Sequence, residues 1–150
     1  MKRARKEHAI RDTGEKGAVV VELALMLPLL VALLVTIVDM GLLLREHQIV
    51  ENAAREGARL SSLPKNQVAP WNPDAAMSTV QERVVDYLAE EGITIDVTAV
   101  QLDQGHPVVV GGQTLTASAV TVTYQRTPLI GFVTSAPVTL SARAIFRNLY

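Results

Sequence analysis

The sequence contains no cysteine among its 150 residues. This absence excludes disulfide bonds, thiolate metal sites and thiol catalysis. Histidine is also scarce: His8, His47 and His106 lie far apart along the chain, and no pair of them has the spacing of metal ligands. We therefore interpret each histidine as a solvated side chain and predict no metal site.

The chain also lacks an excess of basic residues outside its first 17 residues. Residues 1–17 contain six Lys and Arg and three acidic residues, whereas the whole chain has a formal net charge of −1. The leader is therefore positive and the remainder mildly acidic. A nucleic-acid-binding protein would carry its basic surface on the folded domain, so the sequence argues against nucleic acid as a partner.

No group of residues has the pattern of a catalytic site. Gly105 and the pair Gly111–Gly112 lack the order of strand, glycine-rich loop and helix that a phosphate site requires. No Ser or Thr is identifiable as a nucleophile with an activating base. The sequence therefore predicts neither an enzyme nor a cofactor.

The most informative segment that is present is a long apolar run. From Ala18 to Val38 the only ionisable residue is Glu22, and a helix of this length measures about 31 Å, enough to span a hydrocarbon core of about 30 Å. A charge inside such a helix costs about 2.5–3.5 kcal/mol on insertion scales, which makes Glu22 a candidate functional residue. The alternative, a secretory signal peptide, has a shorter apolar region.

The basic leader predicts how this segment is oriented. Lys and Arg concentrate on the cytoplasmic side of membrane helices, so residues 1–17 are expected inside the cell. The prediction is a single pass through the inner, cytoplasmic membrane, ending at about residues 38–44, with the C-terminal domain extracytoplasmic. Asp39, at the outer end, is interpreted as a solvated or interfacial carboxylate or, alternatively, as a group paired within an assembled complex.

Helical periodicity continues past the membrane segment, so one helix is predicted over residues 18–60. Ala53, Ala54, Gly57 and Ala58 form a patch of small residues on this helix. Small side chains allow a close backbone approach, either to the sheet of the same chain or to a helix of a neighbouring subunit. Of these two contacts, the sequence interpretation favours the first.

Residues 74–150 are predicted to form a small α+β domain outside the membrane. Residues 61–73 contain three prolines and are predicted to be a loop. A helix is then expected from Asp74 to about Glu91, because Asp74 is a good N-cap and Gly92 a good terminator.

Beyond Gly92 the apolar residues alternate with polar ones, which predicts three or four antiparallel strands with one buried face. The expected strands include residues 93–99, 115–124 and 138–147, and Gly111–Gly112 supplies a turn. The apolar parity changes between Ala119 and Val120, which indicates a bulge there.

Three motifs resemble the TadE-like family, the pilin-like minor subunits of tight-adherence (Flp-type) pilus systems. They are Gly17-Ala18-Val19-Val20-Val21-Glu22-Leu23, the segment Leu27-Pro28-Leu29-Leu30, and the run from Asn52 to Arg59 that reads Asn-Ala-Ala-Arg-Glu-Gly-Ala-Arg. The likeness covers roughly residues 14–60 closely and only the general strand pattern beyond. It implies a pilin-like fold. The family usually has Phe or Tyr after the glutamate, where this chain has Leu23.

The resemblance implies that a prepilin peptidase cuts the chain between Gly17 and Ala18. It further implies that Glu22 pairs with the new amine of Ala18, on a neighbouring subunit or on the same chain, during pilus assembly. The expected partners are the lipid bilayer, the peptidase, other pilin-like subunits and the pilus assembly platform. The alternative is an uncleaved, signal-anchored single-pass membrane protein whose extracytoplasmic domain binds a partner.

Overall fold

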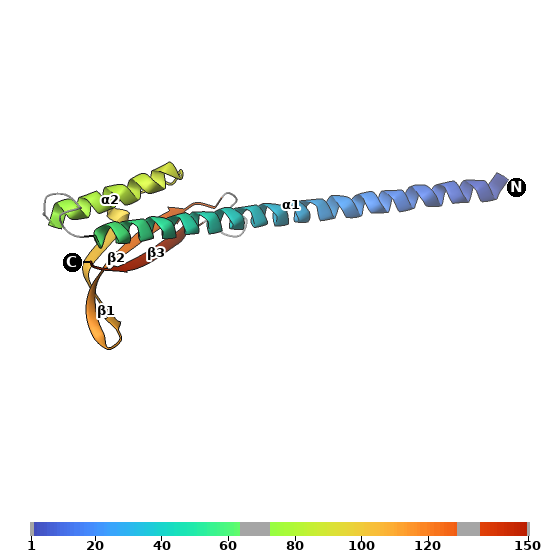
Figure 1. Cartoon of the computed structure of the whole chain (residues 1–150). Coiled ribbons are helices and arrows are strands. Elements are labelled where there is room, and N and C mark those ends of the chain that lie inside the picture. Colours follow the sequence, from blue (N-terminus) through green and yellow to red (C-terminus); the bar gives the residue numbers. More distant parts are fainter. Residues whose placement is uncertain (1, 64–72, 129–135, 150) are drawn as a thin grey trace.

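The computed structural model of the chain shows a long helix that carries a compact head at its C-terminal end (Figure 1). It describes residues 2–63, 73–128 and 136–149; for residues 2–16 and 73–76 it describes only the backbone. The head combines the end of the long helix with a second helix and a three-stranded antiparallel sheet. This architecture confirms the predicted α+β fold.

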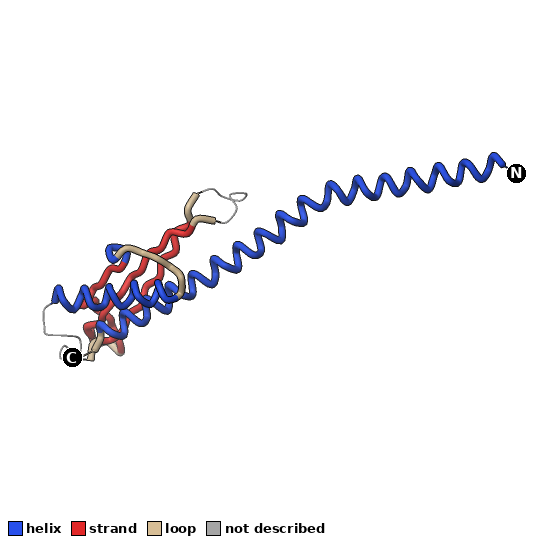
Figure 2. The backbone as a smooth tube through the Cα atoms, turned by 90° about the horizontal axis from the view of Figure 1, so that it is seen from above, coloured by secondary structure: helices blue, strands red, loops and turns tan. Residues whose placement is uncertain are grey.

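Helix α1 spans Lys2–Ser61. It begins before the expected start at Ala18 and continues through Pro28 without interruption; Figure 2 shows it as one gently curved helix. At its C-terminus the hydroxyl of Ser61 donates to the carbonyl of Ala58 at 3.0 Å. The hydroxyl of Ser62 likewise donates to the carbonyl of Arg59 at 2.8 Å. Both bonds supplement the backbone hydrogen bonds of the last turn, and α1 ends one residue beyond its predicted end.

Helix α2 spans Pro73–Glu90, within one residue of the predicted bounds. Gly92 has φ +82°, and the amide of Ile93 donates to the carbonyl of Leu88 at 2.8 Å, a glycine-dependent helix ending. Most of the predicted loop 61–73 and the side chain of Asp74 lie outside the described residues. The fully buried side chains of α2 are Val80, Val84 and Leu88.

The strand predicted over residues 93–99 is wrong. Residues 93–96 have no regular secondary structure, and Val97–Ala99 form a single 3₁₀ turn, η2. The carboxylate of Asp96 accepts hydrogen bonds from the amide of Thr98 at 2.8 Å and from its hydroxyl at 2.7 Å. A local bond of this kind competes with strand pairing, so the alternating apolar pattern was not sufficient to make a strand.

The sheet contains three strands in the order β1-β2-β3, all antiparallel: β1 (Val100–Val110), β2 (Gln113–Arg126) and β3 (Val138–Arg147). Strands β1 and β2 are joined by Gly111 and Gly112, which have φ of 59° and 82°. Two consecutive residues with positive φ are typical of a tight hairpin turn that matches the strand twist. The predicted turn lies where the sequence placed it.

The bulge lies on a different strand from the predicted one. The register shifts between Asp103 and His106 of β1, opposite Ala119 and Ala117 of β2, so β1 contains the extra residue. The carboxylate of Asp103 accepts a hydrogen bond from the amide of Gly105 at 3.1 Å within this bulge. The bulge predicted between Ala119 and Val120 in β2 is therefore wrong.

The change of parity in β2 has a tertiary cause. Ala117, Ser118, Ala119 and Val120 are all buried, because β2 is the central strand and its small side chains lie between those of β1 and β3. Val120 faces the helices, with its Cγ1 3.3 Å from where a Cβ on Gly57 would lie. The two alanines are on the opposite face. A central strand buried on both faces shows no simple alternation.

The hydrophobic core lies between the helices and one face of the sheet. Figure 1 shows α1 running along β2 and β3, with α2 beside it. The core is formed by 14 buried residues, contributed by α1, α2, the segment after α2 and all three strands. They are Ile49, Val50, Ala53, Ala54, Ala58, Val80, Val84, Leu88, Ile93, Val100, Val120, Val122, Ala142 and Ala144.

Candidate functional site: the membrane helix and its junction with the head

The N-terminal part of α1 lies entirely outside the head. Gly17, Ala18 and Glu22 are exposed, as is every residue from Gly17 to Val31. The helix from Gly17 onward is long and apolar enough to cross a membrane by length and composition. A Cβ placed on Gly17 would meet nothing within 4 Å. The bond between Gly17 and Ala18 and the carboxylate of Glu22 are therefore accessible to other molecules along an apolar rod.

The patch of small residues lies at the opposite end of α1. Ala53, Ala54 and Ala58 have no exposed surface, and Gly57 is also buried. A Cβ on Gly57 would lie 2.6 Å from Cγ2 of Val84 in α2 and 3.3 Å from Cγ1 of Val120 in β2. The patch therefore contacts this chain's own second helix and sheet, and its small side chains let α1 approach both.

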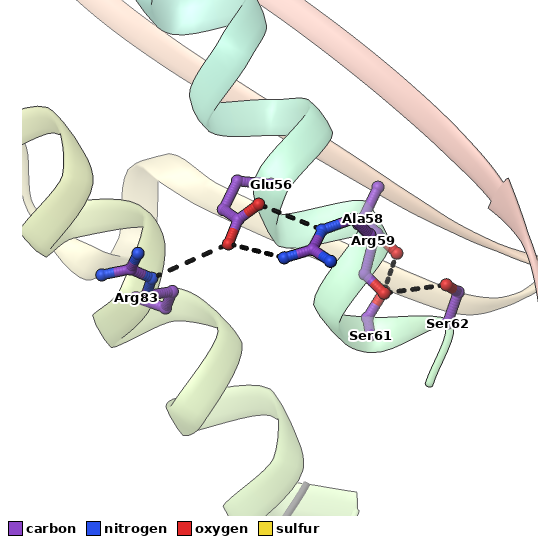
Figure 3. Close-up of polar contacts among 6 residues, drawn as sticks. All are labelled: Glu56, Ala58, Arg59, Ser61, Ser62 and Arg83. Atoms are coloured by element: carbon purple, nitrogen blue, oxygen red, sulfur yellow. Dashed lines mark hydrogen bonds and ion pairs between the residues drawn. The ribbon is translucent and has the colours of Figure 1, made fainter. Parts of the chain in front are cut away.

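Polar contacts connect the two helices beside this patch. The carboxylate of Glu56 accepts hydrogen bonds from Arg59 at 3.2 and 3.3 Å and lies 3.9 Å from Nε of Arg83 in α2 (Figure 3). The hydrogen bond to Glu56 raises the pKa of Arg59. These side chains are exposed or partly exposed, and ion pairs in contact with solvent contribute little to stability. They orient α2 on α1 but contribute little to stability.

A buried arginine joins the head to the outer end of the membrane helix. Arg126, at the end of β2, is 5% exposed, and its guanidinium donates a 2.6 Å hydrogen bond to Oδ1 of Asp39. Its Nε lies 3.0 Å from Oε2 of Glu46 in a charge contact. The carboxylates are 19% and 24% exposed. One cation is thus shared between two anions two helical turns apart. We call Arg126, Asp39 and Glu46 the junction cluster.

The surroundings of the junction cluster favour charged Arg126. Burial alone lowers the pKa of Arg126, but the hydrogen bond that Arg126 donates to Asp39 and the charges of Asp39 and Glu46 outweigh it and raise the pKa above its usual value. Tyr124 lies on the same face of β2, and burial, supported by the charge of Glu46, raises its pKa. The structure therefore corrects both the interpretation of Asp39 as a simply solvated carboxylate and the alternative that it pairs only within an assembled complex. Asp39 pairs within its own chain.

Sequence reasoning missed this cluster because its partners are 87 residues apart. Two weak signals were available. Asp39 and Glu46 are seven residues apart, which places them on one face of a helix. Arg126 is an even number of residues from Val120 and Val122, which places it on the same face of the strand as these apolar residues. Neither observation alone identifies the partner.

A second polar cluster fixes the distal end of the head. The hydroxyl of Ser118, which is fully buried, donates to Oδ1 of Asn148 at 2.7 Å and lies 3.3 Å from the carbonyl of Ser61. The amide of Leu149 donates to the carbonyl of Ser62 at 3.0 Å. The C-terminal segment is thereby attached to the end of α1, so the sheet is fixed to α1 at both ends.

A comparison with protein-family models gives a match over residues 17–59. Comparisons with curated proteins and with solved structures found none. The match begins at Gly17, includes Glu22 and the patch of small residues, and ends at Arg59, so it covers the exposed apolar segment and the part of α1 that packs in the head. It fits a membrane-anchored, pilin-like component of a tight-adherence pilus and confirms the suspected resemblance. Over residues 17–59 the chain matches the family model described as TadE-like protein.

Proposed function

We propose that this protein is a TadE-like minor subunit that is cut by a prepilin peptidase between Gly17 and Ala18 and then acts in assembly of a tight-adherence pilus. The observation that supports this most strongly is the position of the family match, which begins at Gly17 and so starts next to the proposed cut. The exposed, apolar helix that follows is what remains in the membrane after the basic leader is removed.

The structure suggests why the peptidase can reach this bond. Gly17 and Ala18 are exposed on a helix that nothing in the described head covers. A protease binds extended backbone, so the helix must open locally, and glycine in a helix is less stable than alanine by about 0.5–1 kcal/mol. Gly17 therefore lowers the cost of opening at the bond that is cut.

Glu22 is proposed to select the register in which subunits dock. Within the described part of the chain its carboxylate has no hydrogen-bond or ion-pair partner, and the side chain is exposed toward what would be lipid. An unpaired charge in hydrocarbon is costly. Pairing with the amine of Ala18 on a neighbouring subunit, or on the same chain, removes that cost at one axial position.

The proposed topology places the head outside the cytoplasmic membrane. The basic residues of the leader favour a cytoplasmic N-terminus. The junction cluster begins at Asp39, just after the apolar run, so the head stands directly on the membrane surface. Because Arg126 and the distal polar cluster both attach the sheet to α1, movement of α1 during assembly carries the head with it.

The N-terminus of the protein in native membranes tests the cleavage. Intact mass and terminal-peptide analysis are expected to show a chain beginning at Ala18. A Gly17→Leu variant should retain Met1 or Lys2 at its N-terminus, while Gly41→Ala, at another exposed glycine of α1, should be cut normally. A wild-type chain that keeps its leader contradicts the proposal and leaves the anchored binding protein as the function.

Assembly is tested separately from cleavage. Glu22→Ala and Glu22→Gln are expected to insert and to be cut, yet to reduce piliation and recovery of the protein with other pilus subunits. Val20→Ala shortens a nearby apolar side chain without changing any charge and serves as the control. Normal piliation in both Glu22 variants would show that the carboxylate has no role in docking.

A further inference from the structure

The face of the sheet turned away from the helices contains an apolar hollow. Its volume is about 110 Å³, and it is lined by Val108, Val110, Leu115, Ala117, Ile145 and Arg147. Ala117 pairs with Arg147 and Ala119 with Ile145 across β2 and β3, which places these side chains on one face. Ala117 and Ala119 are buried, while Ile145 is 44% exposed. This is an apolar surface that no described element covers.

Two arginines of β3 flank this hollow. Arg143, Ile145 and Arg147 alternate along β3, so they share the open face of the sheet. Arg143 lies 3.2 Å from Nδ1 of His106, and the same nitrogen lies 3.3 Å from Oδ2 of Asp103, which is 57% exposed. Arg147 has no hydrogen-bond or ion-pair partner among the described residues. The open face thus has an apolar hollow beside two arginines, and the carboxylate of Asp103 on the same face leaves these three charged groups net positive.

The opposite side of the head carries the complementary charge. Glu82, Asp86 and Glu90 of α2 are all exposed and recur at every fourth residue, which aligns them in one acidic stripe. Like charges at this spacing destabilise a helix, and within the described part of the chain none of the three forms an ion pair. Ala89 is also exposed and Val85 partly so, which adds apolar surface beside the stripe.

The acidic stripe of α2 and the pair formed by Arg143 and Arg147 of β3 match in length. Glu82 and Glu90 are eight residues apart on a helix, about 12 Å at 1.5 Å per residue. Arg143 and Arg147 are four residues apart on a strand, about 13 Å. Each arginine can therefore face one end of the acidic stripe while Ile145 lies over its middle.

The acidic stripe and the two arginines also lie beside the same part of α1. Arg83 and Glu91, the neighbours of Glu82 and Glu90, pair with Glu56 and Arg45 of α1. Strand β3 spans the same part of α1, because its start pairs with Arg126 of the junction cluster and its end leads to the bond between Leu149 and Ser62. In two copies anchored in one membrane, the acidic stripe of one and the arginines of the other would therefore lie at comparable distances from the membrane surface.

From these observations we infer that the open face of the sheet binds the acidic face of α2 of a second copy of this chain. Ile145 and the hollow contact Val85 and Ala89 of the partner copy, and Arg143 and Arg147 pair with the carboxylates of the acidic stripe. The two surfaces lie on opposite sides of one head. The contact is therefore head-to-tail, and repeated along the membrane it builds rows of subunits and not a closed pair.

This inference goes beyond the proposed function, because it requires neither cleavage at Gly17 nor pairing of Glu22. The absence of cysteine makes a direct test available. Two full-length copies with different tags are produced in the same cells, one with Asp86→Cys and one with Ile145→Cys, and the membranes are oxidised. Disulfide-linked pairs carrying both tags are expected. Val109→Cys, at a residue 70% exposed at the hairpin tip, replaces Ile145→Cys as the control and should give few such pairs.

Charge reversal identifies the partner surface. Arg143→Glu with Arg147→Glu in the Ile145→Cys copy should lower cross-linking about fivefold or more, as expected from the loss of two exposed ion pairs. Glu82→Lys with Glu90→Lys in the Asp86→Cys copy should restore it. Circular dichroism and membrane insertion should be unchanged in all of these variants.

Three results would overturn the inference. They are the absence of mixed pairs, cross-linking equal to that of the Val109→Cys control, and reversal without rescue. The last result would show that the arginines bind an acidic partner other than this chain. Because all variants retain the leader and Glu22, failure here is distinguishable from failure of the proposed cleavage or of docking through Glu22.

Discussion

Replacing Arg126 with alanine is the most demanding test of how the head is held on the membrane helix. Arg126 is the shared partner of Asp39 and Glu46 at 2.6 and 3.0 Å. Its removal leaves two carboxylates facing each other across a partly buried site. We expect the head to be destabilised, because both carboxylates lose the buried cation that they share.

The magnitude follows from burial. Removing one partner of a fully buried ion pair costs about 3–5 kcal/mol, and an exposed pair contributes about 0–1 kcal/mol. Arg126 is 5% exposed, whereas the carboxylates are 19% and 24% exposed and regain some hydration. The expected loss in free energy of unfolding is therefore about 2–3 kcal/mol.

Urea unfolding of the full chain in detergent micelles, followed by circular dichroism, measures this loss from the midpoint and the slope. Arg55→Ala is the matched control, since Arg55 contacts Glu51 at 2.9 Å but is 59% exposed. It should cost less than about 1 kcal/mol. The combination of Arg126→Met, Asp39→Asn and Glu46→Gln should recover most of the loss, because replacing a whole buried charge cluster is often nearly neutral.

Equal effects of Arg126→Ala and Arg55→Ala would refute the reasoning. So would a triple variant less stable than Arg126→Ala, because removal of the two carboxylate charges would then restore nothing and the loss could not come from unpaired charge. A double-mutant cycle of Arg126→Ala with Asp39→Asn separates the pairwise energy from such packing effects.

Three further predictions concern other parts of the head. Gly57→Ala should destabilise the head by up to about 2 kcal/mol in the same assay. Crowding against Val84 and Val120 costs about 1–3 kcal/mol, and the higher helix propensity of alanine offsets about 1 kcal/mol of it. A stabilised variant would contradict this prediction. Ser118→Ala should cost about 1–2 kcal/mol by leaving Asn148 without its buried donor, with faster hydrogen exchange at the Leu149 amide; unchanged exchange would count against the distal cluster. Burial raises the pKa of the Tyr124 hydroxyl. The contribution of this group to stability is therefore complete below pH about 10 and is lost as the pH rises through the folded-state pKa. An absorbance titration should show one tyrosine that ionises at a higher pH than the others, and this signal should disappear in Tyr124→Phe.

Features set by neighbouring residues could be predicted from the sequence. The apolar run from Ala18 to Val38, the end of α2 at Gly92 and the hairpin at Gly111–Gly112 each depend on local periodicity or on backbone conformations that glycine adopts readily. The α+β fold follows from these features and is confirmed. The TadE-like resemblance depends instead on the three motifs between Gly17 and Arg59, and it is also confirmed. The failure at residues 93–99 is also local: Asp96 bonds to Thr98, and the alternating pattern hid that competing turn.

What depends on distant segments was decided by the tertiary structure alone. The sequence interpreted Asp39 as a solvated or interfacial carboxylate or as a group paired in an assembled complex, and only the fold brings Arg126 to it from 87 residues away. The sequence showed a parity break at Ala119, but only the central position of β2 between β1 and β3 explains why residues on both of its faces are buried. Charge and hydrophobicity are properties of a residue, whereas burial and pairing are properties of the space that other segments fill, so the first can be read along the chain and the second cannot.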